Sequence, residues 1–219
     1  ISVLWFHAAS VGELESLWPL VERASRERDL RLVLTVFSSS AFEHLHRGAR
    51  KLEGAAPLFV GYSPLEGQWA AALASARPNL FITAKYEAWP EMWDALARLD
   101  IPLAIIGAKP RSSLMWARRI LRVFSGKVPR LRFFSFDAEN SPGLRRRFPG
   151  AEIHLGSDPR WDRVFQRSEQ IPPRVRELAE EFRDLPRPWG VLGSAWPADV
   201  AIVPSEAEKF PGTLWVVPH

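Results

Sequence analysis

One carboxylate stands where it could take part in acid–base chemistry. Glu13 follows Ser10 by three residues, directly after the apolar run 1–6, and this spacing is that of a capping box at the start of a helix. The dipole of that helix would favour the charged form of the carboxylate, so Glu13 could accept a proton. The capping box alone explains the same spacing, and the residues by themselves leave both interpretations open.

A second pair of charged residues follows another apolar run. Lys85 and Glu87 come directly after residues 80–83 and precede Trp89-Pro90. A lysine and a carboxylate at the end of a buried strand could bind a sugar hydroxyl or a charged group of a ligand. They could equally form an exposed ion pair, which would contribute less than about 1 kcal/mol.

The serines and histidines that follow the second predicted strand give weaker indications of a site. Ser38, Ser39 and Ser40 could contact a phosphate through hydroxyls and helix N–H groups, or could only cap a helix. His44 and His46 are two residues apart on a predicted helix and point to different sides, so we expect no metal site there. We also expect no cofactor. The chain has no cysteine, which excludes disulfides and thiolate–metal sites. It also lacks the glycine patterns of a P-loop or a dinucleotide-binding turn.

The elements that must position these residues alternate between strands and helices. Repeated strand–helix units with short links predict an α/β fold with a doubly wound parallel sheet of the Rossmann-like kind. We expect the polar loops 7–13, 38–40, 84–90 and 107–111 to meet at its carboxyl edge. The predicted strands are 1–6, 31–37, 58–60, 80–83, 103–106, 132–136 and 152–155, and the predicted helices are 11–28, 41–47, 65–75, 91–99, 113–124 and 138–147.

The pattern changes after the last of these strands. We predict a first domain over 1–158, a connector rich in charge and proline over 159–173, and the start of a second α/β domain over 174–219. In that second domain we expect helices at 175–182 and 198–209 and strands at 190–192 and 214–217. Ile1 lies inside a predicted strand and His219 just after another, so we interpret both ends of the chain as cut.

Positive charge is concentrated in one segment. Residues 101–136 hold eight Lys or Arg and no Asp or Glu, whereas the remaining 21 basic and 25 acidic residues sum to −4. The predicted helix 113–124 lies within this segment. It could be a core helix with a solvated basic face, or it could dock to an anionic membrane or phosphorylated lipid. Nucleic acid is not expected as a partner, because the aromatic residues do not alternate with the arginines.

Periodicity assigns each residue of this helix to a side. The predicted apolar side carries Trp116, Ala117, Ile120, Leu121, Val123 and Phe124, and the other side carries Arg118, Arg119 and Arg122 with Met115 among them. No apolar run in the chain approaches the roughly 20 residues that a membrane-spanning helix needs, and no signal peptide is visible.

Five motifs in order along the chain resemble those of the 3-deoxy-D-manno-octulosonic acid (Kdo) transferases. The first looks like the His-Ala-x-Ser-x-Gly-Glu signature of that family, the second its Glu-x-Trp-Pro motif, and the third its Gly-Asp-x-Arg-[aromatic]-Asp-Arg-Val segment. The fourth and fifth are similar to the opening motif of its second domain and to the next strand end. The motifs are His7–Glu13, Glu87–Pro90, Ser157–Val164, Gly193–Asp199 and Val217–His219.

The resemblance implies a two-domain glycosyltransferase of the GT-B type that inverts the anomeric centre and needs no metal. It would transfer Kdo from CMP-Kdo to a lipid A precursor in lipopolysaccharide synthesis. It would work at the cytoplasmic face of the bacterial inner membrane, held peripherally or by an N-terminal anchor absent from this chain. The resemblance also implies that residues 1–219 are an acceptor domain with the start of a donor domain, inactive alone.

Roles carry over by position. Glu13 would be the general base, and Glu87 and Arg160 would stabilise charge around the transfer. The remaining assignments are acceptor binding by Ser10, Gly12, Ser38, Ser39, Ser40, Lys85, Lys109 and Arg111, donor binding by Ser194, Trp196, Pro218 and His219, and an orientation toward the membrane for Arg118, Arg119 and Arg122.

Two departures from the family pattern fall on the acceptor side. Lys85 stands where the family commonly has a second acid, and Gly107-Ala108-Lys109 stands where it has Asn-Ala-Arg. Two alternative functions therefore stay open. One is a non-catalytic lipid- or sugar-binding module of the same fold. The other is a different GT-B enzyme, such as a nucleotide-sugar epimerase, which would not need a basic amphipathic helix.

Overall fold

The structure is a computed structural model that describes residues 1–54, 57–85, 87–169, 171–207 and 209–219. Tyr86 of the predicted loop 84–90 lies outside the described residues, as do Gln170 of the predicted connector and Glu208 of the last predicted helix. The chain divides into two compact units, Ile1–Arg167 and Ser168–His219.

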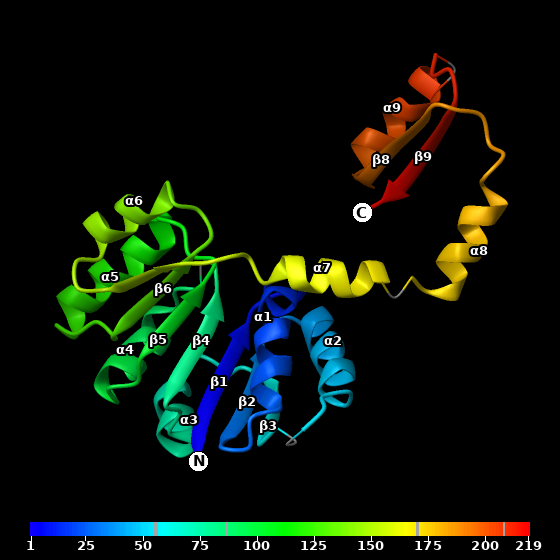
Figure 1. Ribbon diagram of the computed structural model, residues 1–219. Coiled ribbons are helices and arrows are strands. Elements are labelled where there is room, and N and C mark those ends of the chain that lie inside the picture. The colour runs from blue at the N-terminus through cyan, green and yellow to red at the C-terminus, as the bar shows by residue number, and fades with distance from the viewer. Residues whose placement is uncertain (55–56, 86, 170, 208) are drawn as a thin grey trace. The chain divides into compact units, whose positions relative to one another are not determined.

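The first unit is built on a parallel sheet, as the sequence predicts (Figure 1). In the described part of the chain this sheet has seven strands in the order β3-β2-β1-β4-β5-β6-β7. Runs of Val, Leu, Ile and Phe are typical of parallel strands that are buried on both faces. The strands are β1 (Ser2–Ala8), β2 (Leu30–Val36), β3 (Phe59–Tyr62), β4 (Leu80–Ala84), β5 (Leu103–Ile106), β6 (Leu131–Ser135) and β7 (Glu152–Leu155).

Helices cover both faces of this sheet and form two apolar cores (Figure 1). One core includes Leu17 and Leu45 from the helices of one face, and the other includes Trp93 and Leu121 from the opposite face. The first face carries α1 (Val11–Ser25) and α2 (Ser39–Ala49). The second carries α3 (Trp69–Ala76), α4 (Pro90–Arg98), α5 (Ser112–Phe124) and α6 (Asn140–Arg147).

Two boundaries differ from the prediction for physical reasons. β1 continues beyond Phe6 to Ala8, because it is hydrogen-bonded on both sides and its pairing with β2 extends to Ala8 opposite Val36. His7 is therefore a buried strand residue. α3 begins at Trp69 instead of Leu65, because Gly67 has a positive φ of 84° that a helix does not contain.

The predicted connector 159–173 contains a helix, α7 (Arg160–Glu169). Its Arg163 Nε lies 3.1 Å from Glu15 Oε2, and its Nη1 lies 3.6 Å from Glu22 Oε1. Both carboxylates belong to α1. Arg163 of the predicted charge-rich connector therefore has partners in the first unit, which extends to Arg167.

The second unit is small. It contains α8 (Pro173–Glu181), β8 (Trp189–Ala195), α9 (Pro197–Ala207) and β9 (Thr213–Pro218), with β8 and β9 parallel. Aromatic packing holds it together, since the ring of Trp215 lies 4.4 Å from that of Phe182 and 6.4 Å from that of Trp189. Across the described residues of both units, no helix combines the length and apolar character needed to span a bilayer.

Candidate active site

The order of strands changes direction between β1 and β4. These two strands are neighbours and pair up to His7 opposite Thr83. From β1 the chain continues through α1 to β2 on one side of this pair, and from β4 it continues through α4 to β5 on the other side (Figure 1). In open α/β sheets such a switch point leaves a crevice at the carboxyl ends of the strands, where ligands bind. The loops of Glu13 and of Glu87 both begin at this point.

The structure confirms the capping box at the start of α1. The Glu13 amide donates to Ser10 Oγ at 3.4 Å, and the Glu13 carboxylate accepts from the backbone N–H groups of Ala9 at 2.9 Å and Ser10 at 3.1 Å. Both of these bonds go to Oε2. Oε1 takes no part in these two bonds.

Lys85 brings a positive charge to the same place. Its φ of 60° is in the left-handed region, and its amide donates to Ile106 O at 2.7 Å. A Cβ atom added to Gly12 would lie 4.0 Å from Lys85 Nζ, so the ammonium group rests against the first turn of α1. The predicted meeting of the loops after β1 and β4 is therefore observed.

Glu87 is the carboxylate whose environment is most unusual. The pKa of its carboxyl is raised to about 7: burial raises it most, a hydrogen bond from Trp89 Nε1 to Glu87 Oε2 lowers it, and the nearby charge of Glu13 raises it. The Glu13 and Glu87 carboxylates are therefore close enough to interact electrostatically. A carboxyl group that titrates near pH 7 can act as a proton donor or acceptor.

Asp158, which the sequence interpretation does not select, connects Arg160 to this site. Its carboxylate accepts from the Arg160 amide at 3.0 Å and from Arg160 Nε at 2.7 Å. Burial raises the pKa of Asp158, but the bonds from Arg160 and the charge of Lys85 outweigh it and lower that pKa. Its place beside Arg160 in the third motif was the signal that could have identified it.

The other predicted acceptor residues lie at neighbouring strand ends. Ser38 caps α2, since its Oγ accepts from the Ala41 amide at 3.3 Å, which agrees with the capping interpretation. Ser39 and Ser40 are exposed on the first turn of that helix. Lys109 lines a cavity of about 400 Å³ with Asp158 and Arg160. Arg111 is exposed just before α5 and is not among the residues that line this cavity.

The predicted donor residues gather within the second unit. Ser194 Oγ lies 2.6 Å from His219 Nδ1, and the His219 ring stacks on Trp196 with centroids 4.2 Å apart. Pro218 pairs with Ala195 at the end of β9. Ser194 has a positive φ of 57° and lies within β8, where the pairing with β9 is irregular between Gly193 and Ala195. These residues, far apart in the sequence, therefore form one cluster.

The face of α5 differs from the prediction. Trp116 and Val123 are 65% and 78% exposed, although periodicity assigns them to the apolar side. Met115, predicted among the arginines, packs partly buried against the core. Arg118 is half-buried: its Nη1 donates to Arg147 O, and its guanidinium lies 5.5 Å from the centre of the Phe148 ring.

These contacts correct the predicted orientation of Arg118. The exposed side of α5 combines Trp116, Arg119, Arg122 and Val123, and we call these four residues the α5 surface. The reason for the difference lies in α6, because the carbonyl of Arg147 and the ring of Phe148 give Arg118 partners that the helix itself does not reveal.

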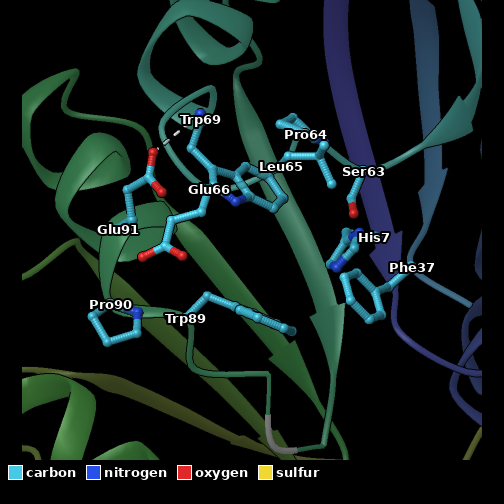
Figure 2. Close-up of a pocket in the computed structure, with 10 residues that line it drawn as sticks. All are labelled: His7, Phe37, Ser63, Pro64, Leu65, Glu66, Trp69, Trp89, Pro90 and Glu91. Carbon is cyan, nitrogen blue, oxygen red and sulfur yellow. Dashed lines mark hydrogen bonds between the residues drawn. The ribbon is translucent and has the colours of Figure 1, made fainter.

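Aromatic residues beside the switch point are the second group that the sequence interpretation does not select (Figure 2). His7 is 1% exposed, its ring packs edge-on against Trp69 at 5.6 Å, and burial lowers its pKa to about 4. The ring centroids of Trp89, just before α4, and Phe37, just after β2, lie 5.4 Å apart. Of these four residues, only His7 and Trp89 belong to motifs, and no local pattern marks the others.

The fold and the site together define a class. A Rossmann-like sheet with ionisable side chains at its switch point, followed in the chain by a second parallel α/β unit, is the GT-B architecture of many glycosyltransferases. The family follows from a comparison of sequences. Residues 2–147 match the profile of the 3-deoxy-D-manno-octulosonic-acid transferase (kdotransferase) family, and the chain belongs to this family.

Curated relatives agree with this assignment. The chain is 29% identical over 125 residues to a probable mitochondrial 3-deoxy-D-manno-octulosonic acid transferase of Arabidopsis thaliana, a match that covers 55% of this chain and 27% of that protein. It is 27% identical over 114 residues to the 3-deoxy-D-manno-octulosonic acid transferase of Aquifex aeolicus, which covers 51% and 30%. The matched segment therefore spans under a third of either relative.

Solved structures support the fold alone. The UDP-GlcNAc 2-epimerase of Neisseria meningitidis aligns with a TM-score of 0.64 at 13% identity, covering 100% of this chain and 65% of that one. The UDP-N-acetylglucosamine 2-epimerase of Rickettsia bellii aligns with a TM-score of 0.68 at 10% identity, covering 100% and 62%. At these identities the likeness says nothing about the reaction.

Proposed function

We propose that this chain forms the acceptor side of a glycosyltransferase that moves Kdo from CMP-Kdo to a lipid A precursor. Membership of the Kdo transferase family supports the reaction class. The observation that carries the proposal is the grouping of Glu13, Lys85 and Glu87 at the switch point of the sheet. A sugar hydroxyl placed there would meet a proton acceptor and a positive charge together.

Glu13 is the general base in this proposal. Its carboxylate takes the proton of the acceptor hydroxyl, and the oxygen attacks the anomeric carbon of Kdo from the face opposite CMP. The bond from that carbon to the phosphate oxygen breaks, and CMP leaves with the bonding electrons. A single in-line displacement of this kind inverts the anomeric centre. The two amide bonds to Oε2 support the role, because they fix the carboxylate in position.

Glu87 and Arg160 act on charge in this proposal. With a pKa of about 7, Glu87 carries a proton for part of the time at neutral pH and can donate it in a hydrogen bond to an acceptor oxygen. Arg160, which pairs with Asp158, places a guanidinium near the phosphate of the donor. Ser194, Trp196, Pro218 and His219 form the first part of the donor site.

We expect the reaction to take place at a membrane surface, because the proposed acceptor is a lipid. We propose that the α5 surface faces the anionic cytoplasmic leaflet of the bacterial inner membrane. Trp116 and Val123 would enter the interface, and Arg119 and Arg122 would meet lipid phosphates. Their exposure on one side of α5 supports this orientation.

A transfer assay tests the reaction. The natural full-length form of the protein is incubated with CMP-Kdo and a lipid A precursor, and the lipid product is identified by mass spectrometry. We expect a mass increase of one or more Kdo units that requires both substrates. UDP-GlcNAc serves as the control donor, and epimerisation of UDP-GlcNAc without Kdo transfer would overturn the proposal in favour of an epimerase.

A further inference from the structure

A cavity of about 450 Å³ opens beside the candidate active site, where β1, β2 and β3 end and α3 and α4 begin (Figure 2). This volume lies in the range of pockets that hold small ligands. Its walls come from five different elements or their adjoining loops. The residues that matter most are His7, Phe37, Ser63, Leu65, Trp69 and Trp89.

The walls of this cavity are mainly apolar. Trp69 is 4% exposed and forms the inner wall, whereas Phe37, Leu65 and Trp89 are 51%, 64% and 41% exposed and form the opening. Large apolar side chains left in water at the mouth of a cavity raise the free energy of the unliganded protein. A ligand that covers them recovers about 25 cal/mol per Å² of apolar surface removed from water.

Two ionisable groups that line the cavity, Glu91 and His7, are engaged by the fold, whereas the exposed carboxylate of Glu66 also lines it. The Glu91 carboxylate accepts from the Gly67 amide at 2.8 Å and from the Trp69 amide at 3.3 Å. His7 Nδ1 lies 3.1 Å from Thr35 Oγ1, and burial lowers the pKa of His7 to about 4, so the ring is neutral at pH 7. Polar side chains are therefore a minority of the residues that line this cavity.

The cavity adjoins the candidate active site through the side chain of Trp89. The indole ring of Trp89 lines the cavity, and its Nε1 donates to the carboxylate of Glu87. Trp89 is therefore a shared wall, with an apolar face toward Phe37 at 5.4 Å and a polar edge toward the ionisable groups. A molecule with a polar head at Glu13 and Glu87 would have an apolar pocket next to that head.

We propose that this cavity binds an acyl chain of the acceptor lipid, while the sugar hydroxyl that receives Kdo lies at Glu13. The inference deepens the proposed function and rests on it for the identity of the whole acceptor. It assigns to Phe37, Leu65, Trp69 and Trp89 a role in acceptor specificity. The occupant is a flexible alkyl chain, because the lining combines aromatic and aliphatic surfaces with few polar groups.

Uncharged alkanols test this proposal on the chain of residues 1–219. Binding of hexanol, octanol and decanol is measured by isothermal titration calorimetry, with methyl glucoside as the sugar probe. We expect the affinity to rise about tenfold for each two added methylenes, because each buried methylene contributes favourably to transfer from water. Methyl glucoside should neither bind nor compete.

Two matched variants locate the binding site. Leu65→Asp places a charge at the mouth of the cavity and should weaken decanol binding at least tenfold. Leu58→Asp is the control: Leu58 is 59% exposed against 64% for Leu65 and does not line the cavity, so binding should be unchanged. Because both side chains are exposed, neither substitution removes a core residue.

Three results would overturn the proposal: no alkanol binding, equal effects of the two variants, or binding of methyl glucoside in place of alkanols. These outcomes are independent of the transfer assay. Alkanol binding without Kdo transfer would refute the proposed function and leave an alkyl-binding cavity. Kdo transfer without alkanol binding would refute the cavity alone.

Discussion

At the scale of the residue, Glu13 has a structural role that is observed and a catalytic role that is proposed. Its carboxylate completes the capping box of α1 and also lies at the switch point of the sheet. Glu13→Gln keeps the size of the side chain and its ability to accept the Ala9 and Ser10 amides, but it removes the proton acceptor. In the natural full-length enzyme we expect turnover to fall by roughly 100-fold or more with little change in the KM for the acceptor.

Steady-state kinetics measure this effect, and thermal unfolding of the same protein serves as its control. If Glu13 only caps α1, the substitution should cost at most about 1 kcal/mol of stability. Turnover close to that of the unsubstituted enzyme in a folded Glu13→Gln protein would refute the role as a base.

Glu87 makes the stability of the fold depend on pH. The pKa of its carboxyl is about 7 in the folded protein against 4.5 as the ordinary value, so between these values the folded state binds one more proton than the unfolded state. The free energy of unfolding should therefore fall as the pH rises from about 4.5 to about 7, by up to about 3 kcal/mol from this group.

Glu87→Gln removes this contribution. The difference in unfolding free energy between variant and unsubstituted protein, measured with denaturant at pH 5 and pH 8, should shift in favour of the variant at pH 8. His7 acts in the opposite sense. Its pKa is lowered to about 4 by burial, so its contribution is lost as the pH falls below about 6.5. His7 is present in both proteins and cancels in the difference, and a pH-independent difference would contradict the expectation.

At the scale of the element, α5 shows that a helix presents the face that its neighbours leave free. Arg119→Glu combined with Arg122→Glu reverses two charges of the α5 surface. We expect binding to vesicles containing anionic lipid to weaken at least tenfold, because each basic residue near such a surface contributes about 1 kcal/mol. Raising the salt concentration should also weaken binding of the unsubstituted protein to these vesicles, because salt screens the charges.

Sedimentation with vesicles measures this binding. Arg145→Glu combined with Arg146→Glu is the matched control, because it makes the same change in net charge on α6, where both residues are exposed. Equal losses in the two double variants would mean that net charge, and not the α5 surface, governs association with the membrane.

At the scale of the whole molecule, the chain matches under a third of each curated relative, and its second unit contains a small sheet of β8 and β9. We expect residues 1–219 alone to show no measurable Kdo transfer, because catalysis requires the whole donor to be held against Glu13. The measurement is release of CMP and formation of the lipid product, with the natural full-length form as the positive control. Transfer by residues 1–219 at a comparable rate would contradict the expectation.

The sequence by itself determined the features that depend on neighbours along the chain. The spacing of Ser10 and Glu13 specifies a capping box, because both partners lie within the first turn of α1. Apolar runs separated by helical patterns specify a parallel α/β sheet, because short links cannot join parallel strands directly. The strand β5 was predicted with its observed bounds, Leu103–Ile106. The five motifs likewise indicate the family, because each is a run of neighbouring residues.

Only the tertiary structure decided which of these local features meet. The pairing of β1 with β4 brings Lys85 against Gly12 and couples Glu87 to Glu13, although more than 70 residues separate these pairs in the sequence. The cavity beside Trp89 and the exposed side of α5 likewise result from contacts between segments that are distant in the sequence. Burial, cavity shape and shifted pKa values arise from contacts between distant segments, and no period or spacing within one segment encodes those contacts.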